Sequence, residues 1–195
     1  IHGYEDTFTI LKNHLDKVSE IAKKYDFIPL IWSDMFFRPW NDGGYCMIDG
    51  KREMPKEFVD AMNPDVIPVY WDYYSDKEEH YTDMFYNHKA FKQKTWFAGG
   101  IWGWHGFTPF NAYSIKNSIP AVESCKKNKI KNIFFTMWGD DGGECSNLAN
   151  LPALFYVAEY AKGNSDEEKI KLKFKRLTGI DFDDFMLLDK PNQVD

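Results

Sequence analysis

The chain has 195 residues and a net charge of −6, and aromatic side chains make up 17% of it. The acidic balance argues against a nucleic-acid-binding protein, which needs a clustered basic face. No run approaches the roughly 20 apolar residues of a membrane span. The length suffices for one domain with a real core, and the aromatic excess is more typical of carbohydrate recognition than of phosphate recognition.

Cysteine and histidine usage indicates neither a disulfide framework nor a metal centre. Cys46, Cys125 and Cys145 form no CxxC pair, and their odd number leaves one thiol unpaired. We therefore predict a reducing compartment, the cytoplasm, although an exported or surface-attached parent protein would also fit. No HxxxH or HxH spacing occurs, so we expect no metal and no cofactor, and we interpret the histidines as surface or satisfied residues.

The first half of the chain predicts helices that alternate with two buried strands. Residues 7–25 carry apolar side chains at steps of three and four, which indicates a helix that Asp6 can cap. Residues 28–32 form a continuous apolar run, as strands of parallel sheets do. The elements predicted next are a long loop over 34–54, a helix over 55–62, a strand over 66–71, a loop over 72–77 and a helix over 78–92.

The second half repeats the alternation. We interpret the basic stretch 126–131 as a solvated helix end, and we expect Pro120 to kink or break the helix that precedes it. The predicted elements are a strand over 96–101, a helix from about 112 to 128, a strand over 133–137, an acidic turn over 139–144, a helix around 148–162, a charged helix from Ser165 to Gly179 and a short apolar cluster over 181–188.

Each predicted strand ends in, or is directly followed by, a tryptophan whose next residue is Gly, Asp or Ser. Repeated strand–loop–helix units predict an α/β fold with a parallel sheet, which is either half of an eight-stranded barrel or an open doubly wound sheet. An open sheet usually concentrates its site at one switch point. Here every strand has its aromatic and polar residues at the carboxyl end, which favours the half-barrel. The outer strands would then be open edges that invite association.

The cluster after the last strand is the sharpest candidate site. Trp138 can stack on a sugar face while Asp140 accepts hydrogen bonds from sugar hydroxyls. The alternative is a helix-start turn in which acidic side chains satisfy free N–H groups. We favour the sugar-binding role for Trp138 and Asp140, and we leave both roles open for Asp141 and Glu144.

The other strand ends supply further candidates. Asp34 follows Trp32 and either binds substrate or caps the loop, and Trp71 precedes two tyrosines, of which one can present its hydroxyl to a ligand. No pair of acids stands out as the general acid and nucleophile of a glycosidase. The remaining candidates are Trp102 and Trp104, which flank Gly103. We expect one of them to face a ligand and the other to face the core.

Four segments, taken in order, carry a family resemblance: WSDMFFR, VYWDYYS, FAGGIWGWHGF and TMWGDDGGECS. They resemble the carboxyl-terminal half of the catalytic barrel of family 20 glycoside hydrolases, the β-N-acetylhexosaminidases, especially bacterial members. The likeness covers nearly the whole chain, with the four strands matching strands five to eight. It implies that residues 1–163 form half of a (β/α)8 TIM barrel, and that residues 164–195 are trailing helices that lead toward a further domain.

The resemblance also implies an activity. Family members hydrolyse terminal N-acetylglucosamine or N-acetylgalactosamine with retention, by a substrate-assisted route through an oxazolinium in which the acetamido oxygen is the nucleophile. An Asp-Glu pair after the fourth strand orients the acetamido group and acts as general acid and base. That pair would lie upstream of Ile1, so no catalytic residue is expected in this chain. Its one Asp-Glu dipeptide, Asp166-Glu167, belongs to a late surface helix.

Substrate contacts follow residue by residue from the same resemblance. Trp32, Trp71 and Trp138 would line the pocket around the acetamido group and the sugar ring. Asp140 stands at the position of the acid in the family's Trp-x-Glu motif and would hold distal hydroxyls. The family places a tyrosine after its seventh strand, where this chain has Trp102-Gly103-Trp104 instead. Tyr73 or Tyr74 would replace it.

Three readings of function remain open, and the third and weakest is an open α/β domain with an unrelated ligand. The first is the sugar-binding wall of a retaining exo-β-N-acetylhexosaminidase that is inactive without its other barrel half. The second is a non-catalytic carbohydrate-binding α/β module that associates with itself through open strand edges. The expected partners are glycans that contain N-acetylhexosamine, together with the missing barrel half or a second copy, and not nucleic acid or membrane.

Overall fold

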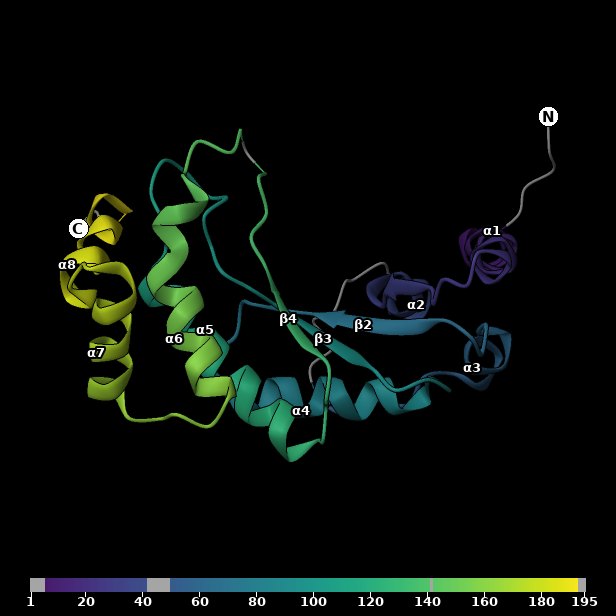
Figure 1. Cartoon of the computed structure of the whole chain (residues 1–195). Helices are drawn as coiled ribbons and strands as arrows, with labels where there is room; N and C mark the ends of the chain where they lie inside the picture. Colours follow the sequence, from purple (N-terminus) through teal and green to yellow (C-terminus); the bar gives the residue numbers. More distant parts are fainter. Residues whose placement is uncertain (1–5, 42–49, 141, 193–195) are drawn as a thin grey trace. The chain divides into compact units, whose positions relative to one another are not determined.

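The computed structural model describes residues 6–41, 50–140 and 142–192, and over these the chain is an α/β protein (Figure 1). Helices alternate with the strands of one four-stranded parallel sheet, whose order is β1-β2-β3-β4. The order therefore follows the sequence without the reversal that creates a switch point in doubly wound sheets. The strands are β1 (Leu30–Trp32), β2 (Ile67–Trp71), β3 (Trp96–Gly100) and β4 (Ile133–Thr136).

Backbone hydrogen bonds establish the parallel direction of the strands. Leu30 lies opposite Ile67 in the β1–β2 pair, and Val69 lies opposite Trp96 in the β2–β3 pair. Between β3 and β4, the Phe97 N–H donates to the Asn132 carbonyl at 3.0 Å, and the Ile101 N–H donates to the Thr136 carbonyl at 2.9 Å. Both strands advance by four residues between these bonds, so they run in the same direction. Parallel pairing brings the carboxyl ends of strands to one edge of a sheet.

Helices and single helical turns connect the strands, as the sequence predicts. Within the described residues there are eight α-helices and four 3₁₀ turns. The α-helices are α1 (Thr7–Lys24), α2 (Asp34–Phe37), α3 (Lys56–Ala61), α4 (Glu78–Asn87), α5 (Asn111–Lys127), α6 (Leu151–Ala161), α7 (Glu167–Thr178) and α8 (Phe182–Met186). The 3₁₀ turns are η1 (Arg38–Trp40), η2 (His88–Ala90), η3 (Asn147–Asn150) and η4 (Leu187–Asn192).

Capping side chains set the helix boundaries. Asp6 accepts a hydrogen bond from the Thr9 N–H at 3.0 Å, which confirms it as the cap of α1. The cap of α7 is Asp166, which accepts from the Lys169 N–H at 3.2 Å, and the helix begins at Glu167, two residues after the expected start at Ser165. Gly179 ends α7 in the left-handed conformation, with φ of 78°, where glycine is favoured.

Two sequence expectations for helical continuity are wrong in part. Pro120 does not break α5, which is continuous over its 17 residues, whereas the alternative of a kink stays a prediction. A proline removes one backbone bond, and Ile115 and Val122, which lie on either side of it, pack into the core and hold the helix. The predicted loop over 34–54 begins instead with the helical turns α2 and η1, and Cys46 lies outside the described residues.

The first strand is shorter and more exposed than the sequence predicts. β1 covers three residues, and Ile28 and Leu30 are 70% and 43% exposed. The apolar run predicts burial on both sides, but β1 is an outer strand of the sheet and pairs with β2 alone.

The chain divides into two compact units, each with its own core. The first comprises the described residues up to Asp72 together with Glu79–Ala98 and Cys125–Ile133. Its core contains an aromatic group around Tyr70, whose ring centroid lies 5.3 Å from that of Phe85 and 5.4 Å from that of Phe97.

The second unit comprises Tyr73–Glu78, Gly99–Ser124 and the described residues from Phe134 onward. Its core joins α5 and α6 to the end of β3 through the buried side chains of Ile101, Val122, Ala153 and Val157. The trailing helices expected over 164–195 pack on α6, because Phe174 of α7 is fully buried and meets the Phe155 ring at 5.5 Å.

Strand β3 requires glycine where an aromatic ring crosses it. A Cβ atom added at Gly99 would lie 2.3 Å from Cε1 of Phe135, a residue that packs on the core of the second unit. We predict that Gly99→Ala lowers the free energy of unfolding by about 1–3 kcal/mol, because the ring must leave its packed position. Denaturant unfolding of Gly139→Ala is the control, because a Cβ at Gly139 meets nothing within 4 Å. Equal stability of the two variants would contradict the prediction.

Candidate functional site

Loops that follow β2 and β3 bring four aromatic side chains together in the second unit. We call Tyr73, Tyr74, Trp102 and Trp104 the aromatic cluster. The two indoles stack with centroids 4.6 Å apart and planes 26° from parallel. The Tyr73 ring meets Trp104 edge-on at 5.2 Å, and Tyr74 meets Trp102 edge-on at 5.4 Å. These geometries are the favoured arrangements of aromatic pairs.

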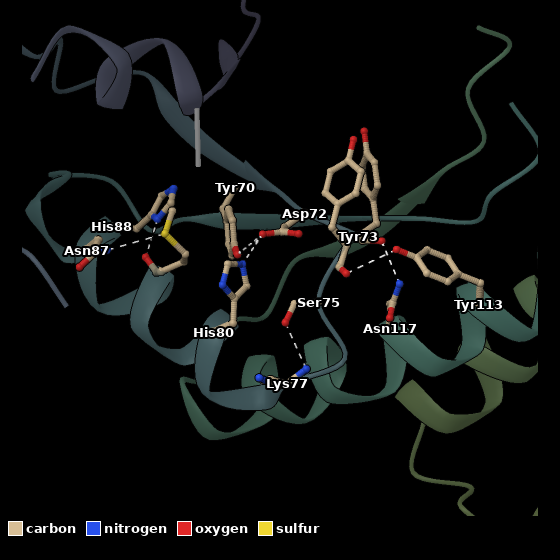
Figure 2. Close-up of polar contacts among 12 residues, drawn as sticks. Tyr70, Asp72, Tyr73, Ser75, Lys77, His80, Asn87, His88, Tyr113 and Asn117 are labelled. Atoms are coloured by element: carbon tan, nitrogen blue, oxygen red, sulfur yellow. Dashed lines mark hydrogen bonds and ion pairs between the residues drawn. The ribbon is translucent and has the colours of Figure 1, made fainter. Parts of the chain in front are cut away.

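Hydrogen bonds to one carbonyl hold the cluster on helix α5. The Tyr73 carbonyl accepts from the Asn117 amide at 3.2 Å, as Figure 2 shows, and from the Trp102 indole N–H at 3.1 Å. The Trp102 backbone N–H in turn donates to the Ser114 hydroxyl at 2.8 Å. Both donors to the backbone carbonyl are side chains, so the loop after β2 is held in place by one residue of the loop after β3 and one residue of α5.

Gly100 lets the cluster approach the strand closely. A Cβ at this position would lie 2.7 Å from ring atoms of Tyr73 and 2.9 Å from Trp104. Glycine within a strand permits such a close approach, because it has no side chain to occupy the space.

Trp138 and Asp140, from the loop after β4, interact with the same cluster. Burial is the main cause that raises the pKa of Tyr73, the neighbouring Tyr74 and the Asp140 charge add to the rise, and the nearby Trp138 side chain opposes it. The Tyr73 and Trp104 side chains are 7% exposed, whereas Trp102 and Trp138 are half-buried and Asp140 is exposed. The buried rings therefore form a base, and two indoles with one carboxylate remain accessible.

The first unit contains the other predicted residues, and here Asp34 binds to protein groups. Its carboxylate accepts a hydrogen bond from the Trp71 indole N–H at 3.3 Å and pairs with Arg38 at 3.2 Å. Asp34 is buried, whereas Trp71 and Trp32, the last residues of their strands, are half-buried. In this structure Asp34 orients Trp71, and a contact of Asp34 with substrate stays a prediction.

A buried carboxylate that is not among the predicted substrate contacts lies directly before Tyr73. Asp72 is 3% exposed and accepts a hydrogen bond from the Tyr70 hydroxyl at 2.9 Å. The His80 Nε2 lies 2.7 Å from the same carboxylate oxygen (Figure 2). Such a pair fixes the end of β2 to the start of α4. The only sequence signal is an acid at a strand end with a histidine one helical turn into the next element.

His88 is a core residue with both ring nitrogens satisfied. Nδ1 donates to the Met84 carbonyl at 2.6 Å, which leaves Nε2 to accept from the Ser33 hydroxyl at 2.8 Å. The side chain is fully enclosed, and burial lowers its pKa to about 4. The structure confirms the interpretation of this histidine as a satisfied residue.

The structure describes no competing metal or thiol site. Over residues 6–41, 50–140 and 142–192, no group of three or more His, Cys, Asp or Glu side chains could hold a metal ion. Cys125 and Cys145 are buried free thiols, and burial raises the pKa of each. Asp141 lies outside the described residues, and Glu144 is exposed.

Comparisons with known proteins gave no relatives. A scan of the sequence against models of known protein families gave no match, and a search of curated proteins gave none either. Among the helices in the described part of the chain, none has the length and apolar character needed to cross a membrane.

The buried histidine predicts a specific dependence of stability on pH. The folded pKa of His88, about 4, lies below the ordinary histidine value of 6.5, so between these two pH values the unfolded chain binds a proton that the folded chain excludes. Stability from this group is present above pH 6.5 and is lost as pH falls through 4, by at most about 3 kcal/mol. We expect His88→Gln to unfold with a weaker pH dependence in this window than the parent chain.

Denaturant unfolding between pH 4 and pH 7 measures the effect. His105→Gln is the matched control, because His105 is exposed, and its pH profile should follow that of the parent. Identical profiles for His88→Gln and the parent would show that the buried imidazole does not contribute.

Proposed function

We propose that this chain supplies the sugar-binding wall of a retaining exo-β-N-acetylhexosaminidase, which removes terminal N-acetylglucosamine or N-acetylgalactosamine by substrate-assisted hydrolysis. The observation that carries the proposal is the aromatic cluster together with Trp138 and Asp140. Indole faces favour the C–H faces of a sugar ring, and a carboxylate accepts hydrogen bonds from its hydroxyls. Trp32, Asp34 and Trp71 remain predicted substrate contacts.

The strand order supports the half-barrel within which this wall would lie. Four parallel strands follow each other in sequence order, and helices separate them. Sites of (β/α)8 barrels are built from the loops at the carboxyl ends of their strands. The aromatic and acidic residues of this chain follow the ends of β2, β3 and β4. We assign these strands, with β1, to strands five to eight of such a barrel.

The proposal assigns the catalytic acid to a part of the protein outside this chain. The one Asp-Glu dipeptide is Asp166-Glu167, and Asp166 caps helix α7 and pairs with Lys169 at 2.9 Å. A helix cap on the surface is not poised for proton transfer to a substrate. Asp140, which is exposed and lies beside Trp138, is suited to hydroxyl recognition.

Sugar binding is the direct test of the wall. We expect N-acetylglucosamine, titrated onto the chain with tryptophan fluorescence as the readout, to bind more tightly than glucose. Trp138→Ala and Asp140→Asn should each weaken binding by about tenfold, because one removes a stacking face and the other a charged acceptor. Trp40→Ala, which changes a half-buried indole of the first unit, controls for a general loss of fluorescence.

A chromogenic N-acetylglucosaminide distinguishes the wall from a whole enzyme. We expect no turnover by the isolated chain, and robust turnover would refute the assignment of the acid to another part of the protein. Sugar binding that is unchanged by both site variants would refute the wall itself.

The alternative function is a non-catalytic carbohydrate-binding module that associates with itself. The exposed apolar segment before β1 favours it, because Phe27 and Ile28 are 69% and 70% exposed beside an outer strand. Exposed edges of this kind invite pairing with another chain. The missing barrel half would cover the same segment in the first proposal, so both functions predict association.

Sedimentation measures this association. We expect the chain alone to form dimers or larger species, and Ile28→Lys to shift it toward monomer by placing a charge at the edge. Leu172→Lys is the matched control, because Leu172 is 56% exposed and belongs to helix α7, not to β1 or the segment before it. A stable monomer of the parent chain would count against an open β1 edge in either function.

A further inference from the structure

A cavity of about 500 Å³ in the first unit takes no part in the proposed sugar site. It lies before β3 and β4, between residues 85–95 and residues 128–132, at the amino ends of these strands. The tryptophans of the aromatic cluster instead follow the carboxyl end of β3. The side chains that line the cavity include no acid and five lysines, which we call the lysine rim: Lys89, Lys92, Lys94, Lys129 and Lys131.

The backbone of the lysine rim is fixed by hydrogen bonds. Lys129 has φ of 57°, a left-handed conformation that costs about 1 kcal/mol in a residue other than glycine. The Ile130 N–H donates to the Cys125 carbonyl at 2.9 Å and closes the end of α5. On the facing segment, the Gln93 amide donates to the Pro64 carbonyl at 2.7 Å. The lysines of the turn after α5 are exposed, as expected of a solvated helix end, and Lys129 and Lys131 also line the cavity.

The charge of the rim is not neutralised within the part of the chain that the structure describes. There, Lys92, Lys94, Lys129 and Lys131 form no ion pair with a carboxylate, and Lys89 lies 5.2 Å from the Tyr86 ring centroid. The chain as a whole carries a net charge of −6. The five lysines around the cavity therefore form a local group of positive charge on an acidic chain. Mutual repulsion of these ammonium groups would be relieved by a bound anion.

The floor of the cavity is apolar and aromatic. Phe85 is 3% exposed, and Phe91 stacks on His88 with centroids 5.6 Å apart and planes 25° from parallel. His88 is neutral near pH 7, because burial lowers its pKa to about 4, so the floor adds no charge. A ligand would thus meet cations at the rim and flat apolar side chains below.

We propose that this cavity binds a phosphorylated small molecule of about nucleotide size, with its phosphate groups at the lysine rim and its body against Phe91. Cavities of this volume accommodate small-molecule ligands. Lysine binds phosphate as a compact point charge, whereas planar carboxylates favour the bidentate arginine fork, and no arginine lines the cavity. Several neighbouring cations match the multiple charges of a di- or triphosphate.

Calorimetric titration of the full chain with ATP, pyrophosphate and adenosine tests the proposal. We expect ATP and pyrophosphate to bind, adenosine not to bind, and added salt to weaken both complexes. The double variant Lys129→Gln/Lys131→Gln should lose about tenfold in affinity for ATP. A second double variant, Lys92→Gln/Lys94→Gln, removes two rim charges from the facing segment and leaves the turn at Lys129 intact.

The matched control is Lys17→Gln/Lys24→Gln, which removes two charges from exposed lysines of α1. Its affinity for ATP should stay within about twofold of the parent. Equal losses in the control and both rim variants would overturn the proposal, because binding would then follow net charge alone. Adenosine that binds as tightly as ATP, or a parent chain that binds neither polyphosphate, would overturn it as well.

Discussion

Parallel pairing of four successive strands is the constraint on which the other features depend. Because the Phe97 and Ile101 N–H groups bond to residues four apart on β4, both strands point the same way, and β1 and β2 pair in the same sense. Loops that follow the strands therefore share one edge of the sheet, and loops that precede them share the other. Residues far apart in sequence, such as Tyr73 and Trp138, can then serve one site.

Because the strands are parallel, the aromatic residues lie in loops that follow the strands, and the lysines lie in segments that precede them. Loops after the strands carry tryptophans, tyrosines and Asp140, which suit a neutral polyol. Segments before β3 and β4 carry five lysines around a cavity, which suit a multiply charged anion. Different hydrogen bonds hold the two sets of residues in place. Side-chain donors from the loop after β3 and from α5 hold the aromatic loop at the Tyr73 carbonyl, whereas a closed helix end holds the lysine turn.

Local features of the fold could be predicted from the sequence, and features that need distant partners could not. The cap at Asp6, the stop at Gly179 and the alternation of strands and helices depend on neighbours within a few residues, and the pattern identifies them. The exposure of β1 depends on its place in the sheet, and the continuity of α5 through Pro120 depends on core packing. Neither is encoded within a short window.

The same division applies to the candidate site. The sequence by itself determined which residue types stand at the strand ends, because the tryptophans directly follow apolar runs. Only the tertiary structure decided their partners: Asp34 binds the Trp71 indole, and Asp72 joins Tyr70 to His80. It also gathered lysines from two segments around one cavity. Burial and hydrogen bonding between distant residues depend on how strands are ordered and helices packed, which no local pattern of residues records.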